Sequence, residues 1–336
     1  MATMRAMQVP RAGADFQLVE REIPQPGRRQ VRIRVQACGV CHSDVITKDG
    51  VLPIQYPRVP GHEVIGTIDA LGADVPSWQV GARVGVGWHG GQDGTCPACR
   101  RGDFANCAST IVCGISYDGG YAEYMVAPLE ALARVPESLD SAEAAPLMCA
   151  GITTFNALRR AGALPSDLVA VQGVGGLGHL GIQFAKKFGY RVAAVGRGPE
   201  NAVLAKTLGA DVYVDSAATD PGAELQRLGG ARVVLSTAPS GKAMSPLING
   251  LGPNGVLVVV GAGPDPIEVA PAQLIFGRKR IQGWSAGIPT DSEDTLRFAE
   301  MTGVRAMIEK FPLARAAEGY ARMMSGKAQF RVVLTM

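Results

Sequence analysis

The chain has 336 residues, of which 47% are hydrophobic and 19% charged, and its formal net charge is +3 at pH 7. The length favours two domains, and so slight a charge argues against a nucleic-acid-binding or membrane-binding surface. Because the first thirty residues contain no apolar signal segment and no run of about eighteen apolar residues follows, we expect a cytoplasmic protein. The seven cysteines, an odd number and mostly clustered, indicate metal binding in a reducing compartment rather than a disulfide framework.

The first half of the chain predicts a β-rich, partly barrelled domain. Residues 30–35 alternate strictly between polar and apolar side chains, and shorter strand-like runs lie at 16–19, 64–68 and 83–86. Such alternation gives a strand one buried and one solvent-facing side, and Gly or Pro bounds the runs. The polar motifs of this half therefore fall on loops.

One stretch, from Cys41 to Glu63, gathers groups that serve a metal ion. Cys41, Ser43 and Asp44 lie at its start, and His62 and Glu63 lie at its end. A thiolate, an imidazole, a hydroxyl and two carboxylates in so short a span are what a catalytic metal site requires. We interpret the stretch as the centre of a zinc enzyme, which needs a third ligand from elsewhere in the chain.

A second cluster predicts a structural zinc site. Asp93, Cys96, Cys99 and Cys107 lie in a lobe that is rich in glycine and small residues. Three cysteines at this spacing supply three of the four ligands of a closed tetrahedral site, and a carboxylate oxygen is able to fill the fourth place. The alternative is a lobe that is metal-free or disulfide-linked.

The second half alternates strands with helices, which predicts a parallel, doubly wound sheet. The apolar runs that we expect to form its strands lie at 168–171, 191–195, 212–214, 232–235 and 256–260. A helix is expected from Leu177, because apolar side chains recur there at helical spacing until Gly189 provides a stop.

A glycine motif joins the first of these strands to that helix. It consists of Gly173, Gly175, Gly176, Leu177 and Gly178. The first glycine permits a tight turn, the second lets a pyrophosphate approach the backbone, and the third allows the helix to pack closely on the sheet. The motif predicts dinucleotide binding, and the alternative is a glycine-rich turn with a structural role only.

The second strand ends at Gly196 and Arg197, where an NAD-binding protein usually carries an acidic residue for the ribose hydroxyls. Glycine leaves room for a 2′-phosphate, and Arg197 is able to pair with it. NADP is therefore favoured over NAD. Alternatively, Arg197 stacks on the adenine or lies in solvent.

Together these motifs resemble the zinc-dependent alcohol dehydrogenases of the medium-chain dehydrogenase/reductase family, and the match runs nearly end to end. The segments that carry the resemblance are residues 39–44, 61–63, the cysteine lobe, 149–154, the glycine motif and 330–334. The resemblance implies an α/β protein with a β-rich, GroES-like catalytic zinc domain at 1–151 and 286–336. It implies a Rossmann dinucleotide-binding domain at 152–285.

The tail of the chain is expected to return to the first domain, a placement that the resemblance supports more than periodicity does. Helices are predicted at 292–301 and 314–325, and a last strand at 330–334.

The resemblance also implies roles for individual residues. Cys41, His62 and Cys149 would ligate the catalytic zinc and leave one position for water or substrate. Ser43 would pass the proton of the alcohol towards solvent, and Asp44 would accept a hydrogen bond from the His62 ring.

Four further residues take implied roles near the metal or the cofactor. Glu63 would lie beside the metal, with a structural salt bridge as an equally plausible reading. Thr153 would contact the nicotinamide, and His42 and Arg331 would neutralise the pyrophosphate.

The chain departs from part of the family at Ile46, where members that relay the proton through a histidine carry that histidine. The proton must then leave through ribose hydroxyls, water or another group. Ile46, Tyr56 and Trp88 are our candidates for the lining of the substrate pocket. Cys38 and Cys113 fall outside the implied ligand sets, and we expect them to be ordinary buried thiols.

The predicted activity is hydride transfer between NADP(H), or NAD(H), and a primary alcohol or its aldehyde, medium-chain or aromatic. The expected assembly is a homodimer or a homotetramer. Two alternatives stay open: a zinc-independent quinone or enoyl reductase, which would not need Cys41, His62 and Cys149 together, and a non-catalytic nucleotide-binding protein.

Overall fold

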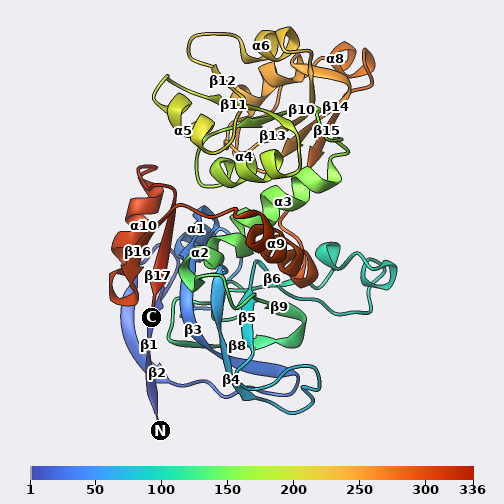
Figure 1. Cartoon of the computed structure of the whole chain (residues 1–336). Helices are drawn as coiled ribbons and strands as arrows, with labels where there is room; N and C mark the ends of the chain where they lie inside the picture. Colours follow the sequence, from blue (N-terminus) through green and yellow to red (C-terminus); the bar gives the residue numbers. More distant parts are fainter. Residues whose placement is uncertain (1) are drawn as a thin grey trace. The chain divides into compact units, whose positions relative to one another are not determined.

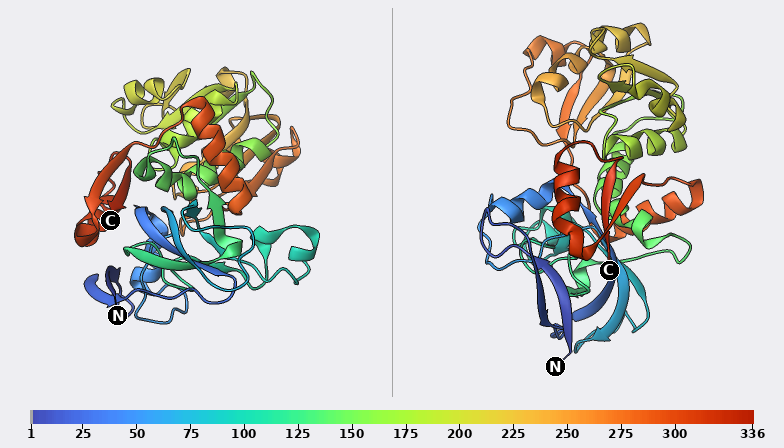
Figure 2. Two further views of the ribbon diagram at one scale, coloured as in Figure 1. Left: turned by 60° about the horizontal axis from the view of Figure 1, so that its bottom comes forward. Right: turned by 90° about the vertical axis from the view of Figure 1, so that its left-hand side faces the viewer.

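The computed structural model describes residues 2–336, and the chain divides into two compact units (Figure 1). Unit 1 combines the residues up to Ile152 with Gly287–Met336, and unit 2 is Thr153–Ala286. Both ends of the chain lie in unit 1 (Figure 2). Within residues 2–336, no helix is long and apolar enough to cross a membrane.

β3 is the central strand of unit 1. It runs over Gln30–Val40 and pairs antiparallel with β4 (Val64–Leu71), β8 (Tyr124–Pro128) and β17 (Arg331–Thr335). Alternate side chains are buried from Val31 to Val35, as the polar–apolar pattern predicts. From residue 37 onward every residue of the strand is buried, so the strand delivers the following residue, the first of the zinc motif, into the interior.

Unit 1 contains further short strands and helices. The strands are β1 (Thr3–Gln8), β2 (Gln17–Glu22), β5 (Arg83–Val86), β6 (His89–Gly91), β7 (Ile111–Val112), β9 (Leu132–Arg134) and β16 (Ile308–Pro312). The helices are α1 (Val45–Asp49), α2 (Ser141–Ala144), α9 (Pro289–Thr302) and α10 (Ala316–Met324). Seven strands form one sheet in the order β16-β17-β3-β4-β5-β9 with β8 paired to β3, while β1-β2 and β6-β7 form separate pairs.

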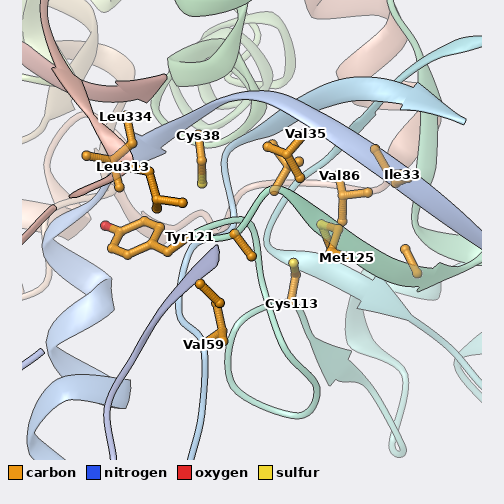
Figure 3. Close-up of a cluster of buried hydrophobic side chains, with 14 of the residues drawn as sticks. Ile33, Val35, Cys38, Val59, Val86, Cys113, Tyr121, Met125, Leu313 and Leu334 are labelled. Carbon is orange, nitrogen blue, oxygen red and sulfur yellow. The ribbon is translucent and has the colours of Figure 1, made fainter. Parts of the chain in front are cut away.

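The apolar faces of these strands pack into one buried cluster (Figure 3). Figure 3 shows the ring of Tyr121 inside this cluster, with Cys38, Val59 and Leu313 around it. Tyr121 and Cys38 are both fully buried. The core of unit 1 therefore reaches directly to the chain segments that carry the zinc motif.

The tail returns to unit 1, where β17 lies between β16 and β3 and pairs with both. α9 begins at Pro289, three residues earlier than predicted, because proline suits the first position of a helix. α10 begins at Ala316 rather than at 314, since Leu313–Arg315 form a separate 3₁₀ turn.

Unit 2 is the predicted doubly wound sheet, with six parallel strands in the order β12-β11-β10-β13-β14-β15. Its strands are β10 (Leu168–Gln172), β11 (Arg191–Gly196), β12 (Val212–Asp215), β13 (Ala231–Ser236), β14 (Leu251–Val259) and β15 (Arg280–Gly283). Its helices are α4 (Gly178–Lys187), α5 (Asn201–Thr207), α6 (Pro221–Arg227), α7 (Gly241–Met244) and α8 (Pro271–Ile275), and α3 (Ala150–Arg160) runs into it. The order reverses between β10 and β13, the point at which such sheets bind dinucleotides.

Candidate active site

Cys41 lies where β3 gives way to the 3₁₀ turn His42–Asp44. Its backbone is extended, with φ −108° and ψ 149°, and its N–H donates to Oδ2 of Asp44 at 2.9 Å. This bond closes the turn and brings the carboxylate back over the start of the motif. Cys41 and Asp44 are both buried.

His62 precedes β4, is buried, and has its ring held by Asp44. Nδ1 of His62 lies 3.2 Å from Oδ1 of Asp44. In the neutral ring, Nδ1–H donates to this carboxylate and Nε2 carries the lone pair. That Nε2 atom is buried and has no hydrogen-bond partner among residues 2–336. A buried nitrogen atom without a hydrogen-bond partner is unfavourable in a metal-free protein. The same atom is well suited to ligate a metal cation.

Cys149 brings a second sulfur from a distant part of the chain. It follows the 3₁₀ helix Ala145–Met148, and its Sγ lies 3.8 Å from Sγ of Cys41. The hydrogen bond between the two thiols lowers the pKa of Cys41 well below its usual value and raises the pKa of Cys149 well above it. Ligand atoms of Cys41, His62, Glu63 and Cys149 all lie within 4.8 Å of one another.

Glu63 is fully buried beside these groups and contacts Arg331. Its Oε1 accepts from Nη2 of Arg331, and the same nitrogen donates to the Val40 carbonyl at 3.3 Å. Burial raises the pKa of Glu63 to about 8, while Arg331 opposes the rise. Gly39 leaves the space for this side chain, because a Cβ there would lie 1.9 Å from Glu63 Oε2. The salt bridge weighed in the sequence analysis is thus present, and a role of Arg331 at the pyrophosphate stays a prediction.

The donor set fits a zinc ion. Two thiols and an imidazole are ligands that zinc prefers in catalytic sites, where one coordination position stays open. A zinc ion would satisfy the orphaned Nε2 of His62 and would replace the protons of Cys41 and Cys149.

The cysteine lobe forms a second cluster, in which ligand atoms of Asp93, Cys96, Cys99 and Cys107 lie within 4.8 Å of one another. The cysteines are free, and Sγ of Cys96 lies 4.0 Å from Sγ of Cys107, about twice the length of a disulfide bond. The disulfide-linked alternative is therefore not what the structure contains.

Backbone amides surround the ligand atoms of the lobe. Sγ of Cys96 accepts from the N–H groups of Cys99 and Ala108, each at 3.5 Å. These two hydrogen bonds lower the pKa of Cys96, which favours a thiolate. Oδ1 of Asp93 accepts from the N–H groups of Cys96 at 2.8 Å and Thr95 at 2.7 Å, which holds its pKa far below the usual range. Asp93 and Cys96 thus present anionic donors of the kind that a structural zinc ion needs, whereas burial raises the pKa of the Cys99 thiol to about 12.

The glycine motif of unit 2 forms the predicted turn between β10 and α4. Gly173 has φ +94°, and a Cβ on Gly178 would lie only 1.6 Å from the Gly173 carbonyl oxygen. A Cβ on Gly175, in contrast, would meet no atom within 4 Å. Gly176 and Leu177 follow at the start of the helix and are partly exposed. Open space above Gly175 at a helix N-terminus fits the pyrophosphate of a dinucleotide.

β11 ends at Gly196, which is buried against Tyr213, whose hydroxyl oxygen would lie 2.6 Å from a Cβ at position 196. Arg197 is exposed, and its guanidinium pairs with no acidic residue of the part of the chain that the structure describes. The next residue, Gly198, donates its N–H to Oδ1 of Asp215 at 2.9 Å, which fixes the turn after the strand. Arg197 is thus available to a ligand.

The other residues of the predicted site differ in exposure. Ser43 is half-buried two positions after Cys41, His42 is exposed, and Thr153 is buried on α3. Ile46 is half-buried on α1.

Of the two aromatic pocket candidates, one lies beside the metal ligands. The Trp88 ring meets the His62 ring edge-on, with 5.1 Å between centroids and 89° between planes. The Tyr56 hydroxyl instead donates to the Thr47 carbonyl at 2.7 Å, which secures the end of α1.

Tyr121 was not among the residues predicted for the site; its hydroxyl donates to Oδ2 of Asp44 at 2.8 Å across 77 positions of the chain. Tyr121 lies outside both metal motifs in the sequence, so no local pattern marks this residue. Cys38 and Cys113 are buried, as predicted, and belong to neither ligand cluster.

Comparison with known proteins agrees with this geometry. Residues 27–137 match the model of the alcohol dehydrogenase GroES-like domain, and residues 176–301 match that of the zinc-binding dehydrogenases. Alcohol dehydrogenase notN of Aspergillus sp. (strain MF297-2) is 46% identical over 311 residues, 93% of this chain and 91% of the relative. An alcohol dehydrogenase of Geobacillus stearothermophilus is 36% identical over 324 residues, 96% of each chain.

Two solved structures extend the match to the fold. A cinnamyl alcohol dehydrogenase from Sorghum bicolor has a TM-score of 0.89 at 30% identity and covers 99% of this chain and 98% of its own. The cobalt- and zinc-bound thermostable alcohol dehydrogenase from Pyrobaculum aerophilum has a TM-score of 0.89 at 28% identity and covers 100% of both chains. The chain therefore belongs to the zinc-dependent alcohol dehydrogenases of the medium-chain dehydrogenase/reductase family.

Proposed function

We propose that this chain interconverts primary alcohols and aldehydes at a zinc ion held by Cys41, His62 and Cys149. The observation that carries the proposal is the buried Nε2 of His62, which lacks a partner among the described residues and lies within 4.8 Å of two thiol sulfurs. Zinc, when bound, supplies a Lewis acid for the substrate oxygen. The glycine motif would hold a nicotinamide cofactor, which would supply the hydride chemistry.

The protein's own side chains hold these ligands and move the proton. Asp44 keeps the ring proton of His62 on Nδ1, which leaves Nε2 as the donor atom. Ser43, half-buried near Cys41, takes the proton of the alcohol. Because Ile46 stands where a relaying histidine would lie, the chain offers no imidazole at that position to take the proton on from Ser43.

The cysteine lobe holds a second zinc ion with a structural role. Three thiols and the Asp93 carboxylate make up its four ligands, and the backbone amides that bind Oδ1 of Asp93 leave Oδ2 for the ion. A carboxylate is a weaker zinc ligand than a fourth thiolate, so we expect this zinc to exchange faster than a Cys₄ site would.

NADP(H) is the preferred cofactor in this proposal. Arg197 is exposed at the end of β11 without an acidic partner among residues 2–336, and Gly196 adds no side chain there. A guanidinium in this place binds a 2′-phosphate through charge-assisted hydrogen bonds, whereas the usual acidic residue would repel it.

The substrate class is a medium-chain or aromatic primary alcohol. Trp88 lies edge-on to His62 and gives the metal site an apolar neighbour. The related sorghum enzyme is named a cinnamyl alcohol dehydrogenase, which supports an aromatic substrate. Family membership supports a homodimer or homotetramer as the working assembly.

The test is a panel of alcohols and aldehydes assayed with NAD(H) and NADP(H), with and without a zinc chelator. We expect turnover of aromatic and medium-chain substrates, a preference for NADP(H), and loss of activity on chelation. Turnover that survives zinc removal would instead indicate a quinone or enoyl reductase. Binding of NADPH without turnover of any substrate by zinc-replete protein would indicate a nucleotide-binding protein.

A further inference from the structure

The Tyr121 hydroxyl reaches the carboxylate that organises the zinc ligands. Tyr121 is fully buried and donates to Oδ2 of Asp44 at 2.8 Å. The same oxygen accepts the Cys41 N–H at 2.9 Å, while Oδ1 lies 3.2 Å from Nδ1 of His62. One carboxylate therefore connects Tyr121 with two of the three proposed zinc ligands.

The tyrosine ring also packs against the chain segment that carries His62. A Cβ on Gly61 would lie 2.5 Å from Cδ1 of Tyr121, so the ring touches the backbone one residue before the ligand. The Tyr121 N–H donates to the Pro60 carbonyl at 3.0 Å, and its own carbonyl accepts from Met7 at 2.8 Å. With the ring enclosed in the core cluster (Figure 3) and the backbone bonded on both sides, the hydroxyl has one fixed position.

The phenol acts as a hydrogen-bond donor. Burial raises the pKa of Tyr121 well above its usual value, and the Asp44 carboxylate adds to the rise, so the hydroxyl keeps its proton. Without this donor, Oδ2 of Asp44 would keep the Cys41 amide as its one partner in this network. A buried carboxylate with fewer hydrogen bonds holds its neighbours less firmly.

We propose that Tyr121 is a positioning residue for the catalytic zinc: its hydroxyl fixes the Asp44 carboxylate in the orientation that holds the His62 ring and the Cys41 backbone. Tyr121 is not among the candidate ligands and acts through Asp44. The inference rests on the zinc ligands assigned in the proposed function.

Zinc release from the Tyr121→Phe variant tests this role, because the change removes the hydroxyl and keeps the ring. Zinc-replete protein is mixed with an excess of a chromogenic chelator, and release is followed with time. Each of the two zinc sites should give its own phase of release. The phase that the Cys149→Ser variant lacks belongs to the catalytic site. We expect Tyr121→Phe to speed that phase about tenfold, the lower end of the effect of removing a group bonded directly to a zinc ligand, and to leave release from the cysteine lobe unchanged.

Tyr117→Phe is the matched control. Tyr117 packs against the same core cluster, and its hydroxyl donates to the Gly90 carbonyl at 3.2 Å, away from Asp44. We expect its zinc release to match that of the unmodified protein. In addition, Tyr121→Phe should not change zinc release further in an Asp44→Asn background, since the two groups act through the hydrogen bond between them.

The outcomes separate this inference from the proposed function. An unchanged catalytic phase in Tyr121→Phe, or an equal acceleration in Tyr117→Phe, would overturn the role of Tyr121 and leave the zinc ligands standing. If Cys149→Ser lost no phase at all, the ligand assignment itself would fall, and the inference with it.

Discussion

Three hydrogen bonds converge on the Asp44 carboxylate, from Cys41, His62 and Tyr121. The second could be foreseen, because the segments that carry Asp44 and His62 resemble those of known zinc enzymes. The third could not, since the Tyr121 contact arises from packing of the core across 77 positions of sequence. A salt bridge of Glu63 was weighed from the sequence, but its partner Arg331 was not identified, because the contact depends on the tail strand β17 lying beside β3.

The cofactor preference is decided at the scale of one residue, Arg197. Replacing it with alanine should raise the KM for NADPH about 10- to 100-fold, because hydrogen bonds to a charged group are lost, while the KM for NADH changes by less than about twofold. Steady-state kinetics with both cofactors and one aldehyde provide the measurement. An equal rise in the KM for both cofactors would favour stacking of Arg197 on the adenine.

Among the elements, the strands with strong apolar patterns were predictable, including the edge strand β12, whereas two edge strands without such a pattern were not. β3, β4, β5 and β10 to β14 were identified from alternation or from apolar runs. β15 (Arg280–Gly283) was missed because this short edge strand lacks an apolar run, and its residues are exposed or half-buried. β16 was missed for a similar reason, since its burial pattern has no buried residue.

The turn between β10 and α4 can be tested with two glycines of one motif. Gly178→Ala should destabilise unit 2 by about 1–3 kcal/mol, because the new Cβ would lie 1.6 Å from the Gly173 carbonyl oxygen. Gly175→Ala should leave the melting temperature unchanged, since no atom lies within 4 Å, but should raise the KM for the cofactor about tenfold or more. Thermal unfolding and cofactor kinetics measure the two effects. A stable Gly178→Ala variant, or unaltered kinetics in Gly175→Ala, would contradict the assignment of this turn.

β16 and α10 are joined by a pair whose contribution depends on pH. Arg322 donates to both oxygens of Glu309, at 2.8 and 2.9 Å, and lowers the pKa of that carboxyl group. The stabilisation is therefore present above the unfolded-state pKa of about 4.3 and is lost as pH falls through the folded-state pKa. Because the pair is partly exposed, Glu309→Gln should cost only about 0.5–1 kcal/mol at pH 7. Thermal unfolding should show this difference shrinking as pH falls below about 4, and a difference independent of pH would show that the charge plays no part.

For the molecule as a whole, the fold class followed from the sequence. The strand-like runs of the first half predicted a β-rich domain, and the alternating strands and helices of the second half predicted a parallel, doubly wound sheet. The structure has a seven-stranded sheet in unit 1 and a parallel six-stranded sheet in unit 2. The return of the tail to unit 1 was supported mainly by family resemblance, because a pattern of apolar residues does not say which sheet a strand joins. Identifying the metal clusters required both the sequence and the structure. Motifs indicated the ligands, and the fold brings Cys149 to Cys41 across 108 positions.

Reconstitution with zinc is the most direct test of the central claim that this chain is an alcohol dehydrogenase acting at the Cys41, His62 and Cys149 zinc. Chelator-treated protein and its Cys149→Ser variant are titrated with zinc, and bound zinc and NADPH-dependent aldehyde reduction are measured together. We predict that turnover returns in the unmodified protein as zinc binds. The variant should take up zinc in the cysteine lobe alone and stay inactive with its fold intact. Full turnover in zinc-free protein, or in Cys149→Ser, would contradict the account.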